Sequence, residues 1–97
     1  MENGIERWRL KIDEIDQKLV ELFNRRAEYA NEIGNIKRKL EIPVYNPQRE
    51  NQIYSHVQLL NSGPLSNEAI RRLFERIIDE TRRLERENFE KETDDGH

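Results

Sequence analysis

The 97-residue sequence contains no cysteine, and this absence excludes disulfide bonds, thiol catalysis and cysteine-based zinc sites. Glycine (4 residues) and proline (3 residues) are scarce, and hydrophobic residues make up 34%, below the roughly 45–50% of a typical globular domain. No apolar run approaches the roughly 20 residues that cross a bilayer, and no secretory signal is visible at the N-terminus. Basic (17) and acidic (20) residues are interleaved with a net charge of -3, which argues against binding to nucleic acid or to a membrane surface. We therefore expect a cytoplasmic protein with a single domain, residues 1–97.

The few breaks divide the chain into three predicted helices, at about residues 5–39, 47–61 and 67–90. The segments between the breaks are rich in Glu, Arg, Lys, Leu and Ala, which favour helix. The tail, 91–97, is polar, and we expect it to fray. The sequence thus predicts an all-α fold with a long first helix.

The starts of the second and third predicted helices carry recognisable capping residues. Asn46 is the predicted N-cap of the second helix, and Pro47 follows it at the first helical position. Ser66 is the predicted N-cap of the third helix, and Glu68 is well placed for the helix dipole.

The first predicted helix carries a heptad stripe along its whole length, and at 1.5 Å per residue this helix is about 50 Å long. Two shorter helices cannot cover a stripe of that length. The pattern therefore predicts that the chain forms a homodimer through this helix. The stripe, called the seam below, comprises Ile5, Trp8, Ile12, Ile15, Leu19, Leu22, Arg26, Tyr29, Ile33, Ile36 and Leu40.

Polar residues interrupt the apolar stripes at a few positions. Arg26 lies within the seam, and Lys37 follows it three turns later at nearly the same azimuth. Glu50 extends an apolar series in the second helix, and Thr81 and Glu85 share a face of the third. A buried charge needs a partner, so Arg26 either pairs with Glu50 or Glu85 to fix the register of the helices, helps to form an anion-binding pocket, or extends to solvent along its stem.

Arg9 lies on the flank of the seam, and taken alone it resembles a solvated surface residue. Within its own helix it is roughly 42 Å from Lys37. If two copies of the first helix cross antiparallel near Leu22, Arg9 of one chain approaches Arg26 and Lys37 of the other.

Three blocks of sequence, NRRAEYANEIGNIK, PVYNPQRENQI and LFERIIDETRRLE, resemble the all-helical (type II) chorismate mutase family. The resemblance covers about residues 5–87 and includes both breaks. It implies an intertwined homodimer with two equivalent sites that convert chorismate to prephenate in phenylalanine and tyrosine biosynthesis, without a cofactor or a metal. The reaction is a unimolecular rearrangement, so it requires no nucleophile.

The resemblance also implies roles for individual residues. Arg9 corresponds to an arginine that the partner subunit contributes to a substrate carboxylate, and Arg26 to the arginine that binds carboxylate from the same subunit. Lys37 corresponds to the lysine that donates a hydrogen bond to the ether oxygen of the breaking C–O bond.

The remaining substrate-binding positions follow in the same way. Arg49 corresponds to a supporting arginine, and Glu50 to the glutamate that accepts a hydrogen bond from the ring hydroxyl. Thr81 stands where serine is frequent. Asn46 stands where several members have aspartate, at a contact made largely through the backbone amide.

Glu85 departs from the pattern of many bacterial members, which have glutamine here and donate a second hydrogen bond to the ether oxygen. An ionised carboxylate can only accept hydrogen bonds, so we expect that Glu85 must be protonated for activity. Two alternatives to the mutase remain open: an isochorismate-pyruvate lyase of the same fold, and a non-catalytic helical dimer or regulatory module.

Overall fold

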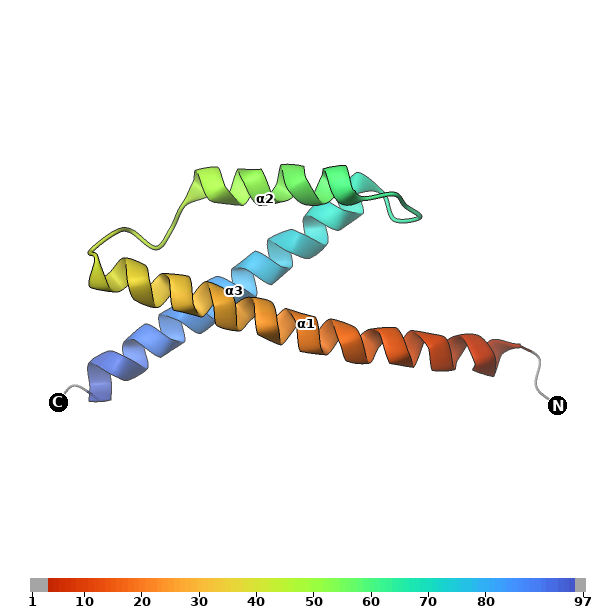
Figure 1. Cartoon of the computed structure of the whole chain (residues 1–97), viewed down its shortest axis with the longest axis horizontal. Coiled ribbons are helices and arrows are strands. Elements are labelled where there is room, and N and C mark those ends of the chain that lie inside the picture. The colour runs from red at the N-terminus through yellow and green to blue at the C-terminus, as the bar shows by residue number, and fades with distance from the viewer. Residues whose placement is uncertain (1–3, 96–97) are drawn as a thin grey trace.

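The computed structural model describes the backbone of residues 4–95 and the side chains of residues 4–90. Three helices form this part of the chain: α1 (Ile5–Lys39), α2 (Pro47–Leu60) and α3 (Asn67–Asp95). Helix α3 crosses α1 obliquely and packs against both α1 and α2 (Figure 1). The all-α prediction is confirmed, and the chain is elongated and flat, with extents of 62 × 31 × 15 Å.

The predicted boundaries agree with the structure at five of the six helix ends, to within one residue. The exception is the end of α3, which was predicted near Glu90 and lies at Asp95. The predicted frayed tail is therefore helical over residues 91–95, because no glycine or proline interrupts the chain before Gly96. Residues 96–97 lie outside the described part of the chain.

Both predicted N-caps are present. The Asn46 side chain accepts a hydrogen bond from the Arg49 amide (3.1 Å), and the Ser66 hydroxyl accepts one from the Ala69 amide (3.0 Å). Each cap satisfies a backbone donor that the first turn of a helix leaves unpaired. The Asn46 cap fixes where α2 begins and therefore where its first-turn side chains point.

Helix α1 ends in a Schellman motif, which turns the chain toward α2. The Ile42 amide donates to the Lys37 carbonyl (2.8 Å), and the Glu41 amide donates to the Arg38 carbonyl (3.2 Å). Glu41 takes the left-handed position of this motif, with a φ of 58°. Glycine usually occupies that position, because a Cβ atom is strained there.

The face of α1 that packs on α3 differs from the heptad seam predicted above, which is called the α1 seam from here on. Gly34, on that packing face, is the buried residue of α1, and Asn31 on the same face accepts a hydrogen bond from the Asn88 amide group of α3 (2.9 Å). The apolar side chains of the seam are instead between 40% and 62% exposed. The heptad stripe therefore does not form the contact within the chain, and one whole face of α1 remains open.

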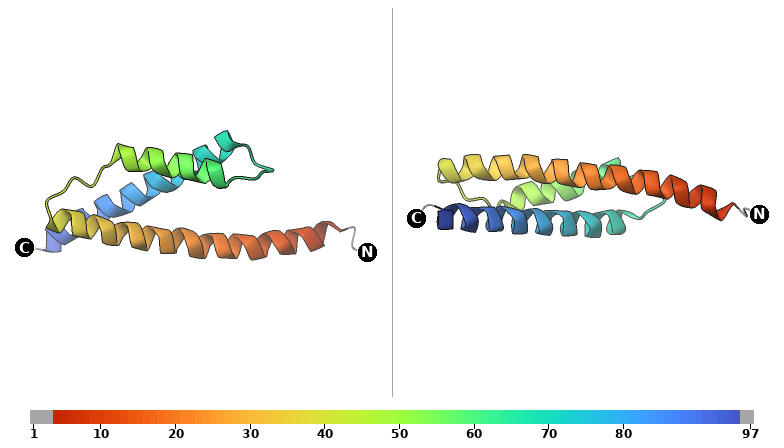
Figure 2. Two further views of the ribbon diagram at one scale, coloured as in Figure 1. Left: turned by 45° about the horizontal axis from the view of Figure 1, so that its top comes forward. Right: turned by 90° about the horizontal axis from the view of Figure 1, so that it is seen from below.

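The internal core is very small. Among the described residues, Tyr54 and Ile78 are the buried apolar side chains. The chain exposes 8372 Å² of surface, whereas a compact monomer of 11.8 kDa exposes about 5,900 Å². In both views of Figure 2, the N-terminal part of α1 extends past the ends of α2 and α3. Over the described residues, none of the helices combines the length and the apolar character that crossing a membrane requires.

Candidate active site

A cavity of about 320 Å³ lies where the second half of α1, the start of α2 and the second half of α3 converge. The connection between α1 and α2 closes one side of it, through Val44 and Tyr45. A second lobe of about 280 Å³ adjoins this cavity, and both lobes are lined by Arg26, Lys37 and Glu85. Their sizes are typical of a site for a small ligand.

The structure brings seven of the eight predicted substrate-binding residues to this cavity. They come from all three helices and from the α1–α2 connection, and they are Arg26, Lys37, Asn46, Arg49, Glu50, Thr81 and Glu85. Residues separated by almost 60 positions in the sequence therefore share one concave surface.

Arg9 is the predicted residue that lies elsewhere. It lies in the second turn of α1, where its guanidinium forms an exposed ion pair with Glu6 (2.7 Å). Seventeen residues of helix separate it from Arg26, which is about 25 Å at 1.5 Å per residue. Arg9 therefore cannot reach the cavity of its own subunit.

Arg26 enters the cavity as a partly buried cation. Its guanidinium lies over the Phe74 ring, 5.9 Å from the ring centroid. Burial lowers the pKa of Arg26, and the nearby Arg49 lowers it further. Among the side chains of residues 4–90, Arg26 forms no ion pair, so of the three alternatives for Arg26 the pairing with Glu50 or Glu85 is not observed, and Arg26 lines the cavity instead.

The carboxylate of Glu50 is paired with Arg82 instead. Arg82 Nε donates to Glu50 Oε2 (3.0 Å), and Arg82 Nη2 donates to Glu50 Oε1. This pair raises the pKa of Arg82, with the hydrogen bond to Glu50 as the largest cause. The bidentate geometry holds both carboxylate oxygens on one side.

Glu85 lies on α3 opposite the closest approach of α1. A Cβ atom placed on Gly34 would lie 3.5 Å from the carboxyl carbon of Glu85, an ordinary van der Waals distance, so Gly34 directly faces this side chain. Burial raises the pKa of Glu85, and Arg38, Lys37 and Arg82 oppose that shift without cancelling it. The environment thus favours the protonated form more than water does.

Thr81 and Asn46 both use their side chains within their own helices. Thr81 Oγ1 donates to the Ile77 carbonyl (2.9 Å), which leaves its lone pairs available to accept a hydrogen bond. Asn46 Oδ1 is occupied by the α2 cap described above.

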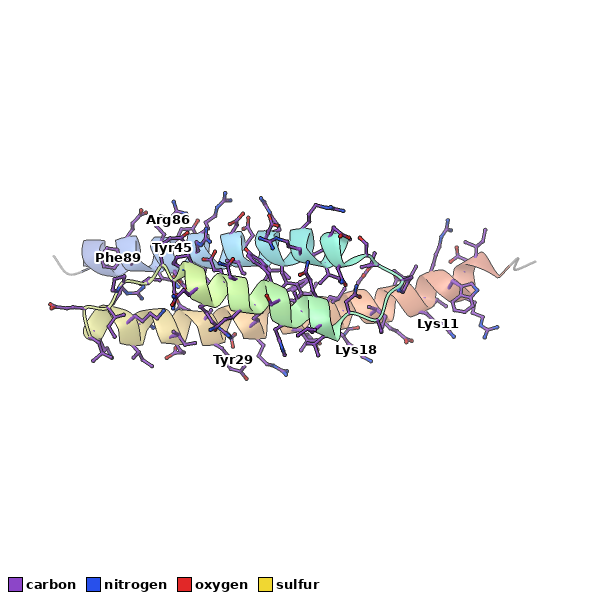
Figure 3. The ribbon with its side chains drawn as sticks, turned by 90° about the horizontal axis from the view of Figure 1, so that it is seen from above. Lys11, Lys18, Tyr29, Tyr45, Arg86 and Phe89 are labelled. Carbon is purple, nitrogen blue, oxygen red and sulfur yellow. The ribbon has the colours of Figure 1, made fainter. Side chains whose placement is uncertain are left out.

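Sequence analysis missed several lining residues, of which Arg82, Arg86 and Tyr45 are polar. Arg86 follows Arg82 by four residues, which is the same spacing that relates Thr81 to Glu85. That spacing was the available signal for a second polar stripe on α3. In Figure 3, Tyr45 lies beside α3, whereas Lys11 lies on the extended part of α1.

The cavity has a cationic character suited to an anionic ligand. Five lining residues are basic and two are acidic, and Arg82 already neutralises Glu50. Arg26, Lys37, Arg49 and Arg86 remain to face a ligand with two negative charges. Within residues 4–90, no cluster of three or more His, Asp or Glu side chains is placed to hold a metal ion.

The chain matches the family described as chorismate mutase type II over residues 8–86. This range includes every predicted site residue.

Two relatives illustrate the range of proteins similar to this chain. A bifunctional chorismate mutase/prephenate dehydratase of Pseudomonas aeruginosa is 42% identical over 82 residues, which cover 79% of this chain and 22% of that protein. A chorismate mutase of Methanocaldococcus jannaschii is 34% identical over 83 residues, which cover 84% of each chain. The chain therefore spans about a fifth of the first relative and most of the second.

A solved structure shares the fold. The chorismate mutase (form II) of Thermus thermophilus superposes with a TM-score of 0.84 at 30% sequence identity, over 87% of this chain and 96% of that one.

Proposed function

The chain belongs to the chorismate mutase type II family, and from that membership we propose that it converts chorismate to prephenate in phenylalanine and tyrosine biosynthesis, acting in the cytoplasm. The observation that carries the proposal is the single cavity in which Arg26, Lys37 and Arg49 meet Glu85. These are the groups that the rearrangement of a flexible dianion requires.

The first task of the site is to hold the substrate in its compact reactive conformation. Arg26 binds one carboxylate in this proposal, with Arg49 in support, because a guanidinium fork matches the two oxygens of a carboxylate. The Phe74 ring behind Arg26 limits the directions in which its guanidinium can point. Holding a near-attack geometry of this kind contributes several kcal/mol, and ideally oriented reactants gain about 7–11 kcal/mol.

The second task is to stabilise the negative charge that develops on the ether oxygen as the C–O bond breaks. The Lys37 ammonium and the protonated carboxyl of Glu85 both donate toward this oxygen in the proposal. One preorganised donor contributes roughly 3–4 kcal/mol. The burial that raises the pKa of Glu85 supports this role, because only the protonated carboxyl is a donor.

The remaining residues orient the ring of the substrate. Glu50 accepts a hydrogen bond from the ring hydroxyl, and Thr81 donates to a substrate carboxylate after releasing its bond to the Ile77 carbonyl. Asn46 contributes its backbone amide, since its side chain caps α2.

We further propose that two copies of the chain form a homodimer through the α1 seam, and that Arg9 of each copy completes the site of the other. The open seam and the surplus of exposed surface, about 2,500 Å² above the value for a compact monomer, support the dimer. Arg9 lies in the second turn of α1, about 25 Å from Arg26 of its own chain, so in this proposal a second subunit receives it.

The direct test follows the loss of chorismate absorbance and the formation of prephenate with added protein. Lys37→Ala should lower kcat by about 10²–10³ because it removes a preorganised donor, whereas the matched change Lys39→Ala, at an exposed residue two positions away, should not.

The same preparation should be assayed for pyruvate release from isochorismate. Pyruvate without prephenate would assign the cavity to a lyase. No turnover of either substrate, and no thermal stabilisation by a bicyclic dicarboxylate analogue of the transition state, would indicate a non-catalytic dimer.

A further inference from the structure

Arg82 joins three segments of the cavity wall. Its guanidinium donates two hydrogen bonds to Glu50 on α2, and it lies over the ring of Tyr45 in the α1–α2 connection, 5.1 Å from the ring centroid. Asp79, one turn earlier on α3, contacts Arg82 Nη1 at 3.4 Å. Asp79 therefore contacts Arg82 from the same helix, while Arg82 itself contacts one residue of α2 and one of the α1–α2 connection.

The pair of Arg82 and Glu50 differs from the other ion pairs in the structure. The pairs Arg71–Glu75 and Arg76–Glu80 are formed by exposed side chains one turn apart on α3. Within residues 4–90, the Arg82–Glu50 pair is the ion pair that connects two helices, and the side chain of Glu50 is 16% exposed. A partly buried, bidentate pair is less screened by solvent and more fixed in direction than an exposed one.

Glu50 has competing cations close by. Arg26 and Arg49 line the same cavity, and a carboxylate free to rotate is attracted to either of them. Such a pairing would neutralise a cation that the substrate needs. Because Arg82 binds both oxygens of Glu50 from the α3 side, it keeps this carboxylate away from Arg26 and Arg49. Each oxygen still has a lone pair with which to accept a hydrogen bond from a ligand hydroxyl.

We propose that Arg82 is a positioning residue for the reaction: through its two hydrogen bonds to Glu50, it orients this carboxylate toward the substrate and prevents it from occupying the substrate's place at Arg26 and Arg49. This inference rests on the proposed function. It assigns a role to a residue that contacts Glu50 rather than the reacting atoms.

The test compares Arg82→Met, which keeps an unbranched apolar stem and removes the fork, with Arg82→Lys, which keeps the charge alone. Arg83→Met is the matched control, because Arg83 is the next residue on α3 and its exposed side chain lies outside the cavity. Arg82→Met should lower kcat/KM by about 10- to 100-fold, as misplacement of a positioned group does, and mainly through a higher KM. Arg82→Lys should fall between Arg82→Met and the wild type, and Arg83→Met should match the wild type.

A double-mutant cycle with Glu50→Gln separates positioning from a structural role. If Arg82 acts by restraining Glu50, Arg82→Met should raise KM strongly when Glu50 is present and little when residue 50 is an uncharged glutamine. Thermal unfolding and gel filtration of each variant establish whether it is folded and assembled. If Arg82→Met does not fold, the inference is judged on Arg82→Lys in the same cycle.

Two results would overturn the inference while the wild type is active. One is equal activity of Arg82→Met and Arg83→Met, and the other is a purely additive cycle. A wild type that does not convert chorismate would overturn the proposed function, and this inference would fall with it.

Discussion

The protonation of Glu85 leads to a test of the mechanism that depends on pH. Burial raises the pKa of Glu85 from its ordinary 4.5, and the activity of the wild type should therefore be highest at acid pH and fall as pH rises through the pKa of this group in the complex. Glu85→Gln replaces the carboxyl with an amide that donates a hydrogen bond at every pH. Its activity should not share this decline.

The size of the effect follows from the loss of one donor. Above the pKa, the protonated fraction falls tenfold per pH unit, so log kcat of the wild type should decline with a slope near -1. The decline should end on a lower plateau, about 10²–10³ below the upper one, because that is the value of one preorganised donor. The kcat values of the wild type and of Glu85→Gln should therefore differ little at acid pH and most at neutral pH.

The free energy of unfolding should also fall as pH rises, because of the same carboxyl group. A raised pKa means that the folded chain keeps the proton of Glu85 at pH values where the unfolded chain has lost it. The unfolded state then binds fewer protons, so this group lowers the free energy of unfolding as pH rises from 4.5 through its raised pKa. The stability of Glu85→Gln relative to the wild type should increase over the same range.

The assay is a pair of pH–rate profiles for prephenate formation, with thermal unfolding measured at each pH. Glu87→Gln is the control, because it removes a charge from the same helix outside the cavity. Flat and parallel profiles for the wild type and Glu85→Gln from acid to neutral pH would refute the reasoning.

Three further predictions address the assembly and the backbone. Mixing inactive Arg9→Ala and Arg26→Ala subunits should restore activity at about a quarter of the sites, because half of the dimers are mixed and each mixed dimer has one intact site. Native mass spectrometry checks that the subunits have exchanged. No recovery in exchanged dimers would contradict the shared site. Glu41→Gly should raise the free energy of unfolding by about 0.5–1 kcal/mol, because glycine adopts the left-handed φ at the end of α1 without strain. A lower melting temperature for this variant would argue against strain at Glu41. Gly34→Leu should lower kcat at least tenfold by displacing Glu85, whereas Gly34→Ala, whose Cβ makes ordinary contacts, should remain folded and active; equal activity of both would show that this close approach does not position Glu85.

The fold was largely predictable from the sequence because its determinants are local. Proline at the first position of α2 and the caps Asn46 and Ser66 act within one turn of the chain. The packing of α1 on α3 was not predictable in this way. The heptad stripe indicates an interface, but the contact with α3 uses the neighbouring face at Gly34, where the glycine directly faces Glu85. Hydrophobic periodicity does not detect that kind of contact.

The cavity residues also differ in whether the local sequence pattern reveals them. Arg26 and Glu50 could be found because each places a charge where the stripe predicts an apolar residue. Arg82 carries only the weak signal of its four-residue spacing to Arg86, because it stands in the charged segment TRRLERE, where one more arginine is ordinary. Its partner lies 32 residues away, and the choice of Arg82 rather than Arg26 as the partner of Glu50 depends on the angle at which α3 crosses α2.

The open face of α1 has a consequence for how the activity arises in a cell. If Arg9 acts across the dimer, a newly made polypeptide carries most of a site but cannot use it until it meets a second copy. Output at low abundance then rises more steeply than the amount of protein, since it depends on encounters between copies. A damaged α1 in one copy also disables the neighbour that relies on it, so the unit on which natural selection acts is the pair.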